Sequence, residues 1–160
     1  MTAPMESLTP PRIHHATCRV IYGDTDAAGV VYNANYLRYF EIGRTELMRD
    51  WVCTYRDIEQ LGIVLPVTEC FTRFKAPAFY DDLLTVETSI AELKRHTCRF
   101  NYRITRKTPG IERRQLLVKG YTIHAAVTRE GKLTRLPEDI TAKLALFLPS
   151  QSTEVDDITK

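Results

Sequence analysis

One long helical pattern, in a chain otherwise rich in strand patterns, constrains the fold most. From Val30 onward apolar side chains recur at three and four residues, which predicts a helix of about five turns with a broad apolar face. Tyr36, Phe40 and Leu47 belong to that face. Gly43 lies near it, although a glycine costs a helix about 1 kcal/mol. We therefore expect the helix to pack closely against a sheet at Gly43.

Alternating polar and apolar residues make up most of the remaining pattern. They predict strands at residues 15–22, 63–75, 83–93, 97–106 and 115–128. Pro137 can start a short helix that ends near Phe147. Consecutive strands joined by short turns run antiparallel. The expected fold is therefore an α+β domain, in which an antiparallel sheet of about five strands wraps around one long helix.

Length and charge limit the classes of function. The 160 residues suffice for one domain, which we place at 13–149, between a disordered lead-in at 1–12 and a polar tail at 150–160. The net charge of +2 does not support a general nucleic-acid binder, which would carry a strong basic excess. No apolar run approaches the roughly 18 residues that a membrane span needs.

The cysteines and the N-terminal residues predict a cytoplasmic protein. Residues 1–12 contain no apolar segment of the kind found in signal peptides. The four cysteines, Cys18, Cys53, Cys70 and Cys98, show neither CxxC spacing nor the spacing of zinc ligands. We expect them to be reduced, partly buried thiols, and we expect no metal site.

Two carboxylates precede the helical pattern in a loop of small residues. Asp24 and Asp26 are typical of turns and helix caps, and such a role alone would explain them. Gly29 permits a backbone torsion or a close ligand approach that other residues do not. The expected helix start, from Val30 to Asn33, carries free N–H groups, and one such donor stabilises an oxyanion by about 3–4 kcal/mol. A base or nucleophile beside oxyanion donors is what an acyl-transfer site requires.

The stretch from Tyr22 to Glu41 closely resembles the 4-hydroxybenzoyl-CoA thioesterase family of hotdog-fold acyl-CoA thioesterases. Weaker resemblances to turns and strands of the same family occur at residues 75–82, 120–127, 131 and 135–137. Together they cover roughly residues 14–147. The resemblance implies a hotdog fold and the hydrolysis of an acyl-CoA thioester to a carboxylic acid and CoA.

The resemblance also implies roles for single residues of the loop. Asp26 matches the family's catalytic carboxylate, which attacks the thioester or activates water, depending on the member. Asn33 falls where a backbone N–H forms the oxyanion hole, at a position where many relatives have His and others Tyr. Asp24 is expected to shape the loop by accepting backbone N–H bonds, and Gly29 and Tyr32 to support the loop and the helix start.

Hotdog proteins that resemble this chain pair their sheets. The resemblance therefore implies a homodimer or homotetramer with active sites at the subunit interface. It implies acyl-CoA as the substrate, and neither a metal nor a redox cofactor.

A basic hairpin tip is a further candidate contact for the substrate. Five basic residues bracket the predicted turn at 108–110, namely Arg103, Arg106, Lys107, Arg113 and Arg114, and the last four are the candidate contacts. A charged tip is usually just solvated. In view of the family, these side chains are also candidates for the phosphates of CoA, which guanidinium groups match well.

Two other functions stay open. A non-catalytic acyl-CoA or acyl-carrier binding module would keep Asp26 only as a cap. A hotdog enoyl-thioester hydratase would need an Asp/His pair in the loop, and Asn33 cannot replace a titrating histidine.

The acyl group also stays open, between benzoyl-type, dihydroxynaphthoyl and short aliphatic groups. Aromatic residues could line an aromatic-acyl pocket, namely Tyr32, Tyr36, Tyr39 and Phe40. Aromatic residues at helical spacing are more often part of a core.

Outside the loop the sequence predicts structural roles. Glu41 and Arg44, three residues apart on the helix, are expected to form an ion pair, which we prefer to a catalytic role for Glu41. His124 has no partner at a recognisable spacing, so we expect a packing or surface role for it.

Overall fold

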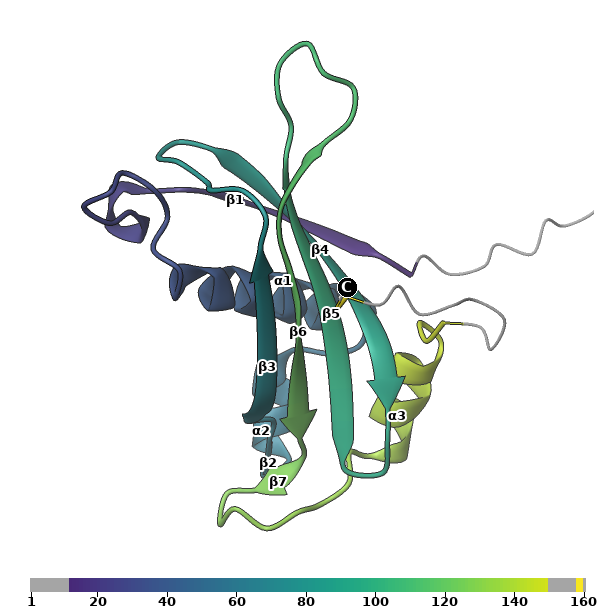
Figure 1. The fold of residues 1–160 in the computed structure, drawn as a ribbon. Coiled ribbons are helices and arrows are strands. Elements are labelled where there is room, and N and C mark those ends of the chain that lie inside the picture. The colour runs from purple at the N-terminus through teal and green to yellow at the C-terminus, as the bar shows by residue number, and fades with distance from the viewer. Residues whose placement is uncertain (1–11, 150–157, 160) are drawn as a thin grey trace, which may run out of the picture.

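The computed structural model describes residues 12–149 and 158–159, and its main sheet is antiparallel with five strands (Figure 1). The strands lie in the order β1-β4-β5-β6-β3. In chain order they are β1 (His14–Arg19), β3 (Val67–Phe74), β4 (Leu83–Leu93), β5 (Thr97–Arg106) and β6 (Gln115–Ala125). The predicted sheet is confirmed. The expected lead-in at 1–12 and tail at 150–160 fall almost entirely outside the described residues.

The long helix α1 (Asn35–Trp51) lies across one face of this sheet (Figure 1). Its apolar face is in the core, where Phe40 and Leu47 are fully buried. Burying a side chain of this size contributes about 1.5–3 kcal/mol. No helix in the described residues combines the length and the apolar character needed to cross a membrane.

At Gly43 the helix α1 lies so close to the sheet that a side chain would not fit. A Cβ atom added there would collide with Oγ1 of Thr88 and Cγ1 of Val86, both on β4. The close packing expected from the sequence is therefore confirmed, and the absent side chain offsets the poor helix propensity of glycine.

α1 begins at Asn35, so the predicted start at Val30 is wrong. The N–H of Val31 donates to the carbonyl oxygen of Ala78, far along the chain, at 2.9 Å. This bond holds the backbone at Val31 in a loop. The helix therefore begins several residues after the point at which the apolar period begins in the sequence.

The two longest predicted strands are interrupted. Each of the segments at 63–75 and 115–128 forms two strands instead of one. The first residues of the former, β2 (Ile63–Val64), pair with the last residues of the latter, β7 (Val127–Thr128), in a separate two-stranded sheet. Pro66, between β2 and β3, has no N–H with which to continue a ladder.

A short helix that the apolar pattern does not predict, α2, spans Tyr55–Gln60. Oγ1 of Thr54 accepts the N–H of Asp57 at 3.2 Å, and Oδ2 of Asp57 accepts the N–H of Thr54 at 3.1 Å. This reciprocal capping box stabilises the start of the helix. The predicted C-terminal helix is present as α3 (Glu138–Ala145).

Arg44 is buried, and it forms no ion pair with Glu41 in the described part of the chain. Its Nη1 instead donates to the hydroxyl of Tyr102 at 3.2 Å. That hydroxyl lies 2.6 Å from Oγ1 of Thr122, which lies 2.8 Å from Nε2 of His124. Burial lowers the pKa of His124 to about 4, and the charge of Arg44 acts in the same direction. The expected packing role of His124 is confirmed.

Candidate active site

The loop between β1 and α1 folds back on itself as a small hairpin. Thr25 pairs with Val31 in an antiparallel bridge, and the N–H of Asp26 donates to the carbonyl oxygen of Val30 at 2.9 Å. Gly29 has a φ of +80°, in the left-handed region that glycine adopts without steric cost. Its N–H donates to the carbonyl oxygen of Asp26 at 3.0 Å, which closes the tip of the hairpin.

Asp26 presents an exposed carboxylate on this hairpin. Its Oδ1 accepts the N–H of Ala28 at 2.8 Å, which holds the side chain against its own loop. Its Oδ2 has no hydrogen-bond partner within residues 12–149 and 158–159. The loop therefore orients one oxygen and leaves the other available to water or a substrate.

Asp24 has the opposite environment, because its side chain is buried with only 1% exposure. It is the last residue of the one-turn 3-10 helix η1 (Tyr22–Asp24). Its Oδ2 accepts the hydroxyl of Tyr39 at 2.9 Å and the N–H of Ile21 at 3.2 Å. Its Oδ1 lies 3.0 Å from Nη2 of Arg38. Burial and the neighbouring carboxylate together raise the pKa of Tyr39.

The main chain of Asp24 joins the loop to α1 as well. Its carbonyl oxygen accepts the N–H of Tyr32 at 2.8 Å and the side-chain amide of Asn35 at 2.7 Å. Asp24 thus fastens both arms of the loop to the first turn of the helix.

Asn33 is exposed and lies in the turn that precedes α1. Its N–H has no acceptor among the described residues, and the same holds for the N–H of Ala34. Both donors lie at the positive end of the α1 dipole. The predicted set of free donors is wrong in part, because the N–H groups of Val31 and Tyr32 are already bonded.

The aromatic residues around the helix start have different environments. Tyr32 is 52% exposed, whereas Tyr36, Tyr39 and Phe40 are buried in the core. The hydroxyl of Tyr36 accepts the N–H of Ala78 at 3.1 Å. The three buried rings therefore stabilise the fold behind the loop.

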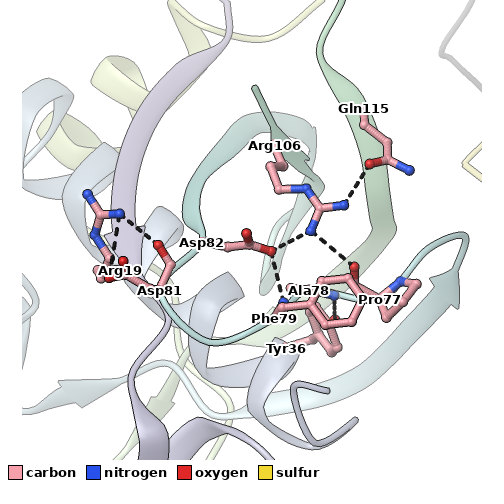
Figure 2. Close-up of polar contacts among 9 residues, drawn as sticks. All are labelled: Arg19, Tyr36, Pro77, Ala78, Phe79, Asp81, Asp82, Arg106 and Gln115. Carbon is pink, nitrogen blue, oxygen red and sulfur yellow. Dashed lines mark hydrogen bonds and ion pairs between the residues drawn. The ribbon is translucent and has the colours of Figure 1, made fainter. Parts of the chain in front are cut away.

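Arg106 is already engaged by other parts of the protein, as Figure 2 shows. Its Nη1 donates to the carboxylate of Asp82, and its Nη2 donates to Oε1 of Gln115 at 2.7 Å. Nη1 also lies 3.5 Å from the carbonyl oxygen of Pro77. Both terminal nitrogens of Arg106 thus already donate to protein acceptors.

A groove of about 430 Å³ lies beside Arg106. Lys107, Arg114 and Arg19 also line it, whereas Arg113 does not. Lys107, Arg113 and Arg114 are exposed, and none pairs with a carboxylate in the part of the chain that the structure describes. The structure therefore brings three of the four predicted phosphate contacts to one groove, two of them with unengaged side chains.

A larger cavity, of about 550 Å³, lies beside α3. Its lining includes His96, Cys98 and Leu136, but none of the residues of the 22–34 loop. No group of three or more His, Cys, Asp or Glu side chains within the described ranges is arranged to hold a metal ion.

The pairing of Asp82 with Arg106 was not predicted from the sequence. A signal for it exists in the strand pattern, because β4 and β5 are joined by a short turn and pair with Leu84 opposite Arg106. That register places Asp82, just before β4, beside the end of β5.

Relatives of known name support the resemblance. A family model described as the Thioesterase-like superfamily matches residues 20–144. Acyl-CoA thioesterase YbgC of Haemophilus influenzae is 35% identical over 127 residues, which cover 78% of this chain and 88% of the relative. The 4-hydroxybenzoyl-CoA thioesterase of Pseudomonas sp. is 32% identical over 123 residues, which cover 75% of this chain and 86% of the relative.

Solved structures agree with these relatives. A mutant 4-hydroxybenzoyl CoA thioesterase complexed with 4-hydroxybenzoyl CoA has a TM-score of 0.76 at 27% identity, covering 84% of this chain and 99% of that one. The 1,4-dihydroxy-2-naphthoyl-CoA thioesterase from Synechocystis has a TM-score of 0.74 at 26% identity, covering 83% and 96%. The family and the hotdog fold expected from the sequence are thus confirmed. The chain belongs to the Thioesterase-like superfamily and is a thioesterase with a hotdog fold.

Proposed function

We propose that this thioesterase hydrolyses an acyl-CoA to a carboxylic acid and CoA, with Asp26 as base or nucleophile and the backbone N–H of Asn33 as oxyanion donor. One observation carries the proposal: a single folded loop holds an exposed carboxylate oxygen and an amide donor, both without partners in the described residues. Relatives named acyl-CoA thioesterase and 4-hydroxybenzoyl-CoA thioesterase support acyl-CoA as the substrate class.

Either role of Asp26 gives a balanced reaction. As a general base, its carboxylate takes a proton from water while the water oxygen attacks the thioester carbonyl carbon. As a nucleophile, the carboxylate attacks that carbon itself, and water then hydrolyses the mixed anhydride. In both routes the C–S bond breaks and CoA leaves as the thiolate, which takes up the proton lost by water, so that the Asp26 carboxylate is regenerated. Every step uses only water, the substrate and this chain's own groups, so we assign no cofactor to it.

The negative charge that develops on the thioester oxygen needs a donor. The N–H of Asn33 would stabilise it by about 3–4 kcal/mol, the size measured for single donors of this kind. The side-chain amide of Asn33 does not titrate, so no proton transfer is assigned to it. Asp24, Gly29 and Tyr32 support the geometry through the bonds and the torsion described above.

The phosphates of CoA are proposed to lie along the groove lined by Lys107 and Arg114. Arg113 is on the same exposed connection between β5 and β6 and would add to the positive field there. Unengaged cations are suited to this purpose because no carboxylate has to be displaced.

We also propose a homodimer or homotetramer with active sites at the interface. Asp26 is exposed in the single chain, and a second copy packed against the loop would enclose its carboxylate. The edge strand β3 has exposed apolar side chains, including Val67 and Phe74, that a second copy could cover. The cytoplasm is the proposed compartment, since all four cysteines are free thiols.

Release of free thiol from a panel of acyl-CoA thioesters tests the proposal. The panel contains benzoyl-type, dihydroxynaphthoyl, short aliphatic and enoyl thioesters, and compares the wild type with Asp26→Asn and Glu41→Gln. Glu41 is an exposed acid of α1 outside the loop, so its variant controls for loss of a surface charge. We expect hydrolysis that depends on Asp26 alone. Binding of acyl-CoA without thiol release would favour the binding module, and hydration of the enoyl thioester without thiol release would favour the hydratase.

A further inference from the structure

The side chain of Arg106 joins the end of β5 to two other segments, the turn at 77–82 and the start of β6 (Figure 2). It donates to Asp82 just before β4, to Gln115 at the start of β6 and to the carbonyl of Pro77. Arg106 and Asp82 are mostly buried, with side-chain exposures of 18% and 20%. An ion pair in such a setting is strengthened by its low exposure, and losing one partner leaves a poorly solvated charge.

Asp82 connects Arg106 to the backbone of the turn at 77–82. Its Oδ2, the atom that accepts from Arg106, also accepts the N–H of Phe79 at 2.8 Å. The guanidinium carbon of Arg106 lies 5.5 Å from the centre of the Phe79 ring. The turn contains Asp81 at a φ of +68°, a conformation unusual for a residue with a side chain. The hydrogen bond from the N–H of Phe79 to Asp82 thus spans the residue with the positive φ and stabilises the turn in this conformation.

The same turn supports the loop that carries Asp26. The carbonyl oxygen of Ala78 accepts the N–H of Val31 at 2.9 Å, and Val31 pairs with Thr25, the neighbour of Asp26. The N–H of Ala78 donates to the hydroxyl of Tyr36 on α1 at 3.1 Å.

A ring contact adds to this support. Tyr22 of η1 stacks on Tyr80 of the turn, with 3.8 Å between the ring centroids. The turn therefore contacts the loop at η1 and again at Val31, on both sides of Asp26.

From this chain of contacts we propose that Arg106 is a positioning residue of the thioesterase. Through Asp82 it fixes the 77–82 turn, and through Ala78 the turn fixes the hairpin that carries Asp26 and, just beyond its bridge at Val31, the turn that carries the N–H of Asn33. The inference rests on the proposed roles of those two residues. It assigns Arg106 a function other than the phosphate contact expected from the sequence, because both terminal nitrogens of Arg106 already donate to other segments of the protein.

Steady-state kinetics separate the two roles of Arg106. A positioning residue acts on the chemical step, so Arg106→Gln should lower kcat by about tenfold to a hundredfold while KM changes by less than about threefold. Arg106→Lys should give an intermediate kcat, since one ammonium can keep the bond to Asp82 but cannot span all three acceptors. A rise in KM at unchanged kcat would overturn the proposal and return Arg106 to phosphate binding.

Arg103→Gln is the matched control. Arg103 lies on the same strand and pairs with Glu87 of β4, with Nε 3.4 Å from Oε2, but it does not contact the turn. This variant also removes a cross-strand ion pair between β4 and β5, and its kcat should stay within about twofold of the wild type. An equal loss of kcat in both variants would overturn the proposal, because it would reflect general weakening of the sheet.

Amide hydrogen exchange gives a readout that does not depend on turnover. The N–H groups of Val31 and Phe79 should exchange faster in Arg106→Gln than in the wild type, and at wild-type rates in Arg103→Gln. If Arg106→Gln does not fold, Arg106→Lys and Asp82→Asn take its place in the same comparison. Unchanged exchange at Val31 in a variant that breaks the pair would overturn the proposal. Full hydrolysis by Asp26→Asn would instead overturn the proposed function, while the exchange result would still report on the support of the loop.

Discussion

Asp24 is buried against Tyr39, whose hydroxyl donates to the Asp24 carboxylate at 2.9 Å. This contact, with the bond from the N–H of Ile21, fastens the loop to α1. Two residues further on, Asp26 is exposed and keeps one oxygen without a partner in the described chain. Two acids of the same short motif therefore have opposite environments, one suited to structure and the other to chemistry.

Substitution of the two acids should give opposite results. Asp24→Asn should lower the free energy of unfolding by about 3 kcal/mol, because it leaves buried donors without their charged acceptor. Asp26→Asn should change that free energy by no more than about 0.5 kcal/mol, since the side chain is exposed. Urea denaturation of both variants measures the difference. Equal destabilisation would contradict the division of roles between the two acids.

Alanine at Gly43 should destabilise the protein even though alanine is the better helix former. The added methyl group would collide with Val86 and Thr88, and overpacking of this kind costs about 1–3 kcal/mol. Glu41→Ala, at an exposed position of the same helix, is the control and should stay within about 0.5 kcal/mol of the wild type. A stabilised Gly43→Ala variant would show that helix propensity outweighs packing at this position.

His124 should make the protein less stable as the pH falls from 6.5 toward 4. Burial lowers its pKa from 6.5 to about 4, so in this range the unfolded chain binds a proton that the folded chain does not. The contribution is fully present above pH 6.5 and amounts to at most about 3 kcal/mol. Unfolding free energies of the wild type and His124→Gln, measured between pH 7 and pH 4, isolate it. An identical pH dependence in the two proteins would show that His124 is not the group responsible.

Charge reversal in the groove should weaken substrate binding more than chemistry. Lys107→Glu combined with Arg114→Glu should raise KM for acyl-CoA by at least about tenfold, since each charged contact is worth about 1.5–3 kcal/mol. Arg113→Glu should have a smaller effect, because Arg113 does not line the groove. Kinetics at two salt concentrations measure both effects. An unchanged KM in the double variant would exclude this groove as the phosphate site.

Much of the fold could be predicted because it depends on local periodicity. The α1 pattern, the glycine at its sheet-facing side and the alternation in β4, β5 and β6 are all visible within short windows. The start of α1 was misplaced because the bond that excludes Val31 from the helix comes from Ala78. The Thr54/Asp57 capping box was present in the sequence, but α2 is too short for an apolar period to show it.

The candidate site was predictable only in part, for a related reason. The pattern of the motif places Asp24 and Asp26 together, but their burial depends on α1 residues such as Tyr39. Arg106 looked like a phosphate contact because its partner, Asp82, belongs to a different strand connection. Arg44 looked like a partner for Glu41, whereas its hydroxyl acceptor lies on β5. Contacts between distant segments decided each of these cases.

The rate of thiol release by Asp26→Asn, at saturating concentration of the best acyl-CoA substrate, tests the central claim most directly. Loss of a base or nucleophile should lower kcat by at least about a hundredfold. The variant should keep the wild-type unfolding free energy and the wild-type affinity for acyl-CoA. The reason is that Asp26 is exposed and its side chain bonds only to its own loop. A kcat near that of the wild type would contradict the assignment of Asp26 as the catalytic residue.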